Sequence, residues 1–194
     1  ILLRQNVSAW QVEVCKFFSL VVFNYLFSNG DAHLKNFSLQ ETINGDYVLS
    51  PAYDLLNTSI HINDGDFALQ NGLIPKSEYS EVYSKTSHPC KDDFITFGNR
   101  IGVVQKKLYS TIEMFATEQE KVYELAKLSV LENKLNINFD ILDGKPELEI
   151  VSISVYNGNS SMMMQNSSMT VTNGIIVMII TSIVAYLIAH INFS

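Results

Sequence analysis

Apolar residues are densest between residues 8 and 28, where they face nearly every side of a predicted helix. Such a helix either lies at the centre of a large core or spans a membrane. Glu13 and Lys16 interrupt it early, and the pure apolar run that follows is well short of the roughly 20 residues that cross a bilayer. We therefore expect a buried core helix.

Both ends of this helix carry recognisable signals. Ser8 followed by Gln11 predicts a capping box that satisfies two N–H groups of the first turn. Asn29-Gly30 predicts the end of the helix, with Gly30 in the left-handed conformation. Residues 31–36 then form a polar loop directly after a rigid element, where a functional loop is held well.

A β-hairpin is predicted after this loop. Residues 37–43 and 47–50 are compatible with strands, and Asn44-Gly45 between them is a strong hairpin signal. Eight steps lead from Asn36 out to the turn and nine lead back to Asp54, so at about 3.3 Å per residue the two arms nearly match. We therefore expect Asp54 to return close to Asn36.

The next segment, residues 57–80, is expected to be loop-like. Its Asn63-Asp64-Gly65-Asp66 cluster resembles part of a calcium loop, but the ligand spacing and the closing Glu are wrong, which favours a solvated turn. Helices are predicted over residues 91–99, ended near Gly102, and over 103–115. A third helix is predicted to begin with a capping-box pair, Thr117 and Glu120.

The character of the chain changes after about residue 135, which suggests a lobe over 1–135, a linker over 136–173 and an apolar tail over 174–194. Residues 150–194 contain no Asp, Glu, Lys or Arg, and 175–191 are a nearly pure apolar run of 17 residues. That length is near the lower limit for a bilayer span. A membrane anchor, a β-branched core segment and a non-native tail all remain open.

Charge and cysteine content narrow the function classes. The chain of 194 residues is 47% hydrophobic and 17% charged, so it can bury a core. Its net charge of −7 argues against nonspecific nucleic-acid binding, which needs a basic face. Cys15 and Cys90 lie far apart and outside metal-ligand spacing, so a reducing, cytoplasmic location without disulfides is expected.

The candidate chemistry lies in the loop and beyond the hairpin. Asp31 and Asn36 have the Asp-x₄-Asn spacing of a protein-kinase catalytic loop, and Asp54 has the place of the metal-binding Asp that follows such a loop. One carboxylate would accept the proton of the attacking hydroxyl, while the amide and the second carboxylate would hold Mg²⁺. His33 and Lys35 would add donor or positive groups near a transferring phosphate.

Plainer interpretations compete with this one. Asp-x₄-Asn occurs often by chance, so Asp31 could be a turn residue after Gly30, and Asn36 a cap at the start of a strand. His33 could be a hydrogen-bonded loop histidine. The hairpin and Asp54 favour the kinase-like interpretation.

Several motifs together resemble the C-terminal domain of HipA-family kinases, the toxins of type II toxin–antitoxin modules. The resemblance covers roughly residues 1–130. Its motifs are Asn24-Tyr25-Leu26, Asn29-Gly30-Asp31-Ala32-His33-Leu34-Lys35-Asn36-Phe37-Ser38-Leu39, Leu49-Ser50-Pro51-Ala52-Tyr53-Asp54-Leu55-Leu56-Asn57-Thr58, Asp66-Phe67-Ala68-Leu69 and Phe97-Gly98-Asn99-Arg100-Ile101-Gly102.

The resemblance implies a mainly α, protein-kinase-like C-lobe with a short β-hairpin beside the catalytic loop. It implies an ATP- and Mg²⁺-dependent serine/threonine kinase in which Asp31 is the catalytic base, Asn36 and Asp54 bind Mg²⁺, and His33 and Lys35 lie beside the phosphates. It also implies a protein substrate such as an aminoacyl-tRNA synthetase and a HipB-like antitoxin, with DNA reached only through the antitoxin.

The departures from the family pattern leave alternatives open. The sequence holds no Gly-rich phosphate loop, no β-strand lysine for the phosphates and no adenine hinge, which belong to an N-lobe that would precede Ile1. We therefore expect little or no kinase activity from this chain alone. A lipid-kinase-like fragment and a non-catalytic binding module, tethered to a membrane by the tail, are the alternatives.

Overall fold

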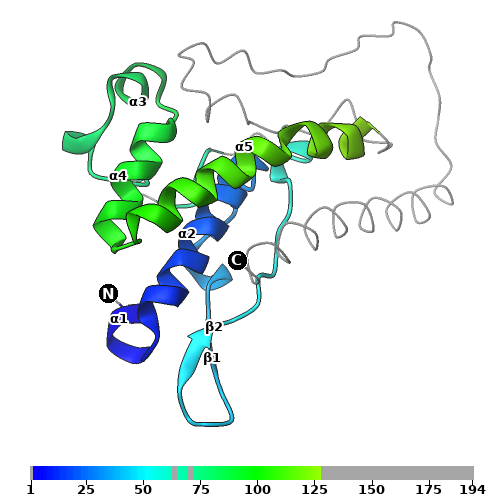
Figure 1. Ribbon diagram of the computed structural model, residues 1–194. Coiled ribbons are helices and arrows are strands. Elements are labelled where there is room, and N and C mark those ends of the chain that lie inside the picture. Colours follow the sequence, from blue (N-terminus) through cyan, green and yellow to red (C-terminus); the bar gives the residue numbers. More distant parts are fainter. Residues whose placement is uncertain (1, 63–64, 70–71, 128–194) are drawn as a thin grey trace, which may run out of the picture.

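The fold is described by a computed structural model for residues 2–62, 65–69 and 72–127. Within these residues it is mainly helical with one small sheet, which confirms the predicted class (Figure 1). The elements in chain order are α1 (Leu2–Asn6), α2 (Trp10–Leu26), the 3₁₀ helix η1 (Leu34–Asn36), β1 (Leu39–Glu41), β2 (Tyr47–Leu49), η2 (Thr58–Ile60), η3 (Lys76–Glu78), α3 (Glu81–Thr86), α4 (Lys91–Ile101) and α5 (Gln105–Lys127).

Helix α2 is the centre of this arrangement. It contacts α1, α4, α5 and β2, and the long helix α5 crosses over it in Figure 1. Phe18, Val22 and Leu26 of α2 are fully buried, as are Leu108 and Phe115 of α5. Apolar residues on nearly all sides of α2 are thus explained by neighbours on several sides, as expected of a core helix.

The predicted signals at the ends of α2 were wrong. The residue at the N-terminal cap is Ala9, and no side chain caps the helix. The Ser8 hydroxyl instead contacts Asp46 Oδ1 at 3.2 Å, which ties the helix start to the hairpin. At the other end the helix stops at Leu26, so the left-handed position falls on Ser28 (φ 51°) and not on Gly30.

The hairpin forms as predicted, with shorter strands. Leu39 pairs with Leu49 and Glu41 with Tyr47, antiparallel. The buried Glu13 of α2 anchors it, because its Oε2 accepts the Leu49 backbone N–H at 2.8 Å. The other oxygen of Glu13 pairs with Lys16 at 2.9 Å.

The later helices differ in number from the prediction. The helices expected over 103–115 and from Thr117 are one helix, α5, and the Thr117 hydroxyl donates to Glu113 O within it at 2.8 Å. The segment expected to be a loop contains the 3₁₀ helices η2 and η3. The short helix α3 follows directly after that segment and was not predicted. Gly102 ends α4 in the left-handed conformation (φ 89°), as its position after the helix suggested.

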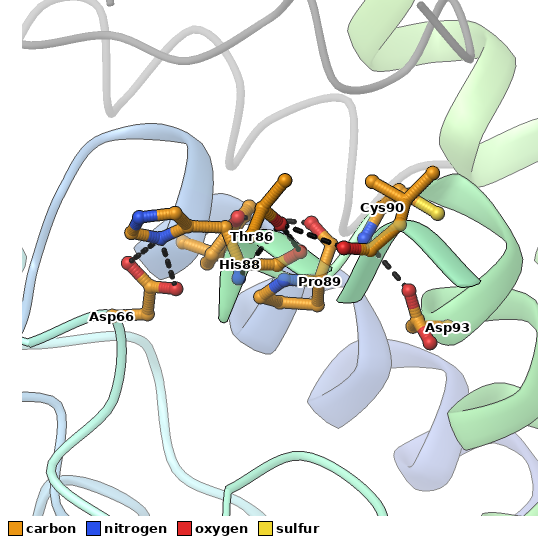
Figure 2. A network of polar contacts seen from close by, with 8 residues as sticks. Asp66, Thr86, His88, Pro89, Cys90 and Asp93 are labelled. Carbon is orange, nitrogen blue, oxygen red and sulfur yellow. Dashed lines mark hydrogen bonds and ion pairs between the residues drawn. The ribbon is translucent and has the colours of Figure 1, made fainter. Parts of the chain in front are cut away.

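A polar network joins the loop after the hairpin to the segment between α3 and α4 (Figure 2). His88 Nδ1 lies 2.9 and 2.7 Å from the two oxygens of Asp66, and Asp93 accepts the Cys90 N–H at 2.8 Å. The Tyr25 hydroxyl of α2 donates to Pro89 O at 2.9 Å. Burial raises the pKa of the Asp66 carboxyl above its ordinary value, although the neighbouring His88 opposes this shift.

The remaining predictions fall largely outside the described residues. The linker over 136–173 and the tail over 174–194 lie there, as does the Asn63-Asp64 part of the rejected calcium loop. Among the described helices, none has the length and apolar character needed to cross a bilayer.

Candidate functional site

The predicted catalytic loop is built directly onto the end of α2. The Asn29 N–H donates to Asn24 O at 2.8 Å and closes the helix, and the Asn29 carbonyl accepts the Ala32 N–H at 3.3 Å. The His33 carbonyl then accepts the Asn36 N–H at 2.9 Å, within the turn of η1. These bonds fix the loop at both ends, so its geometry follows that of the core helix.

The hairpin brings Asn36 and Asp54 together, as the equal arms predicted. Asn36 Nδ2 donates to Asp54 Oδ2 at 2.6 Å. Ser50 N–H donates to Ser38 O at 2.8 Å, which continues the ladder one pair beyond β2. The same register would place Asn36 opposite Ala52, and Asp54, two residues further along, adopts the left-handed conformation (φ 56°).

This pair fits a hard divalent cation. A small cavity of about 10 Å³, room for about one water molecule, lies against Asn36 and Asp54 and is also lined by Asn24 and Asn29. Mg²⁺ keeps several waters and takes one or two protein carboxylates together with phosphate oxygens. Among the described residues, no group of three or more His, Cys, Asp or Glu is placed to hold a metal ion.

Cation binding requires a specific change at Asn36. The amide now faces Asp54 with its NH₂ group, which is a donor and cannot ligate a metal. Rotation of the amide about its last side-chain bond would exchange NH₂ for the oxygen Oδ1. The hydrogen bond to Asp54 and the binding of a cation between the two residues are therefore mutually exclusive.

The other predicted residues are placed on the same loop without being joined to this pair. Asp31 and Lys35 are exposed. Among the described contacts, no hydrogen bond or ion pair links the side chain of Asp31, His33 or Lys35 to Asn36 or Asp54. His33 Nδ1 is buried without a hydrogen-bond partner among the described residues. Buried polar atoms without a hydrogen-bond partner are uncommon in folded proteins.

Sequence reasoning gave no role to the residues that join the two halves of the site. Asn29 Nδ2 donates to both Asn24 Oδ1 and the Asp54 carbonyl, at 2.8 and 3.0 Å. The Thr58 hydroxyl accepts the Gly30 N–H at 2.9 Å. Two signals were available. Asn24, Asn29 and Thr58 all stand in the family motifs, and the amide of Asn24 lies in an otherwise apolar stretch, where a buried amide needs polar partners.

Comparison with known proteins shows the family. The sequence model of the HipA-like C-terminal domain matches residues 2–123, which include the predicted catalytic loop, the hairpin and Asp54. The chain belongs to this family. The resemblance read from the motifs is thereby confirmed.

Two curated relatives of this HipA-like domain carry kinase names. "Putative kinase Y4dM" of Sinorhizobium fredii is 46% identical over 59 residues, which cover 30% of this chain and 14% of the relative. A "Putative kinase" of Haemophilus influenzae is 29% identical over 140 residues, covering 66% of this chain and 38% of the relative. The HipA-like domain thus spans less than half the length of either relative.

Proposed function

We propose that this HipA-like domain carries the base and the metal ligands of an ATP-dependent serine/threonine protein kinase. The observation that carries the proposal is the 2.6 Å contact between Asn36 and Asp54, because it joins an amide and a carboxylate that lie eighteen residues apart. The kinase names of the two relatives support the same reaction class.

In this proposal each residue has a defined task. Asp31 orients the acceptor hydroxyl and takes its proton, for which its exposed position at the loop is suited. Asn36, through Oδ1, and Asp54 would hold Mg²⁺. The bound ion would neutralise charge on the phosphates. His33 and Lys35 would lie beside the phosphates and supply donor or positive groups.

The nucleotide half of the site would come from residues outside this chain, as in a kinase with an N-lobe. By the same resemblance, the acceptor is a protein such as an aminoacyl-tRNA synthetase, and a HipB-like antitoxin regulates the kinase in the cytoplasm. These partners and this location are predictions that rest on the family alone.

Asp31 provides the decisive experiment. In a full-length protein that contains this chain, Asp31→Asn should lower transfer of the ATP γ-phosphate to protein by about 10²–10⁴-fold, the usual contribution of a general base. Glu41→Gln, an exposed substitution on β1, is the matched control and should retain activity. Unchanged transfer by Asp31→Asn, with the fold intact, would show that the base is assigned wrongly.

A further inference from the structure

We propose that Asn29 is a positioning residue that sets the backbone of Asp54 for metal binding. This inference rests on the proposed function, because it assigns a supporting residue to the proposed Mg²⁺ site. It starts from the bonds of one side chain, which is 3% exposed and reaches two separate segments of the chain.

The backbone of Asp54 needs such support. Its φ of 56° lies in the left-handed region, which non-glycine residues adopt only when surrounding contacts hold them there. The side chain of this residue meets Asn36. The Asn29 amide donates to the Asp54 carbonyl at 3.0 Å, so the bond acts on the backbone of the residue that carries the proposed metal ligand.

The side chain of Asn29 is not needed to end the helix. The Asn29 backbone N–H closes α2 on the Asn24 carbonyl at 2.8 Å, and truncation of the side chain leaves that bond in place. The second amide proton of Asn29 is used on Asn24 Oδ1. Asn29 therefore contacts Asp54 directly, whereas the described hydrogen bonds of the Asn24 side chain do not reach Asp54.

A second contact leads from the loop to the same segment. The Thr58 N–H donates to the Ser28 carbonyl at 3.1 Å, and the Thr58 hydroxyl accepts from Gly30. The chain from residue 54 to residue 58 is thus held at both ends by the loop of residues 28–30. Asn29 holds the end that carries the metal ligand.

The chain offers a matched pair of variants. Asn24 and Asn29 are both buried amides, at 5% and 3% exposure, and they share one hydrogen bond. Asn29→Ala removes the bond to the Asp54 carbonyl, whereas Asn24→Ala leaves it in place. Both variants lose a buried amide of the same size, so a comparable fall in melting temperature is expected from each.

The experiment measures Mn²⁺ binding to the full 194-residue chain. Binding is monitored by the decrease in the electron paramagnetic resonance signal of free Mn²⁺. Mn²⁺ takes the same oxygen ligands as Mg²⁺. The Mn²⁺ binding that is lost in Asp54→Asn is assigned to the proposed site. Asn29→Ala should weaken binding at that site by about tenfold or more, as is usual when an outer partner of a metal ligand is lost. Asn24→Ala should weaken it by less than about threefold.

The outcomes separate the two proposals. If Asn29→Ala binds Mn²⁺ as the wild type does, or if both variants weaken binding in step with their melting temperatures, Asn29 is structural only and the positioning role is wrong. If Asp54→Asn abolishes no Mn²⁺ binding of the wild type, the metal pair itself is wrong, and both proposals fail. Weakening confined to Asn29→Ala supports the inference.

Discussion

Glu13 connects the core to the functional hairpin, and its removal should be costly. Its carboxylate is 3% exposed, accepts the Leu49 N–H and pairs with Lys16. Glu13→Ala leaves the Leu49 N–H buried without a protein acceptor, whereas Glu13→Gln keeps an oxygen in reach of it. The pair of variants therefore separates the anchor bond from the charge.

The two contributions have different sizes. An unsatisfied buried N–H costs about 1–3 kcal/mol. The ion pair contributes less than about 1 kcal/mol, because the Lys16 side chain remains 32% exposed and solvent screens it. Glu13→Ala should thus lower the free energy of unfolding by about 1–4 kcal/mol, and Glu13→Gln by less than about 1 kcal/mol.

Urea unfolding measures both values, with the single tryptophan, Trp10, as the fluorescent reporter on α2. Hydrogen exchange adds a local test, since the Leu49 amide should exchange faster in Glu13→Ala than in Glu13→Gln. Equal losses of stability in the two variants, with equal exchange at Leu49, would refute the idea that the bond to the hairpin dominates.

Two further predictions concern the packing and the polar network. Gly98→Ala should lower the free energy of unfolding in urea by about 1–2 kcal/mol despite a better helix propensity, because the added Cβ would lie 2.5 Å from Leu108 Cδ1. The control Asn99→Ala, at an exposed position of the same helix, should be neutral or stabilising. Equal results for the two variants would contradict the overpacking. Because the pKa of Asp66 is raised above 3.8, ionisation of Asp66 is disfavoured in the folded protein, so wild-type stability should fall relative to Asp66→Asn as pH rises from 3.8 through the raised pKa. Unfolding free energies measured at several pH values test this, and a difference that grows in favour of the wild type would contradict it.

The proximity of Asn36 and Asp54 was predictable because it follows from the geometry of the hairpin alone. Counting residues along a hairpin places Asn36 near Asp54, because the rise per residue in a strand is nearly constant. The backbone conformation of Asp54, which is left-handed, was not predictable in this way. Nothing in the residue type requires that conformation. It depends on contacts from a distant loop, which spacing cannot reveal.

Helix ends were the least predictable part of the fold. Ser8 has the residue type of a cap, but the hairpin supplies Asp46 as a competing partner. Thr117 also has that type, yet it lies within α5, where its hydroxyl bonds back to Glu113 O and the apolar face of the helix continues. Short polar side chains serve both as caps and as surface residues, so tertiary packing decides which role they take.

The hairpin also has a practical consequence for protein engineering. In its turn Ile43 is fully exposed and Gly45 is in the left-handed conformation, while Asp46 at its base accepts a hydrogen bond from the Ser8 hydroxyl. Adding one residue to each strand would keep the pairing between the arms, whereas adding a single residue would reverse the side chains of one arm. The tip at residues 43–45 is therefore a suitable insertion point for an affinity tag or a fluorescent reporter, at the end of the hairpin away from Asn36 and Asp54.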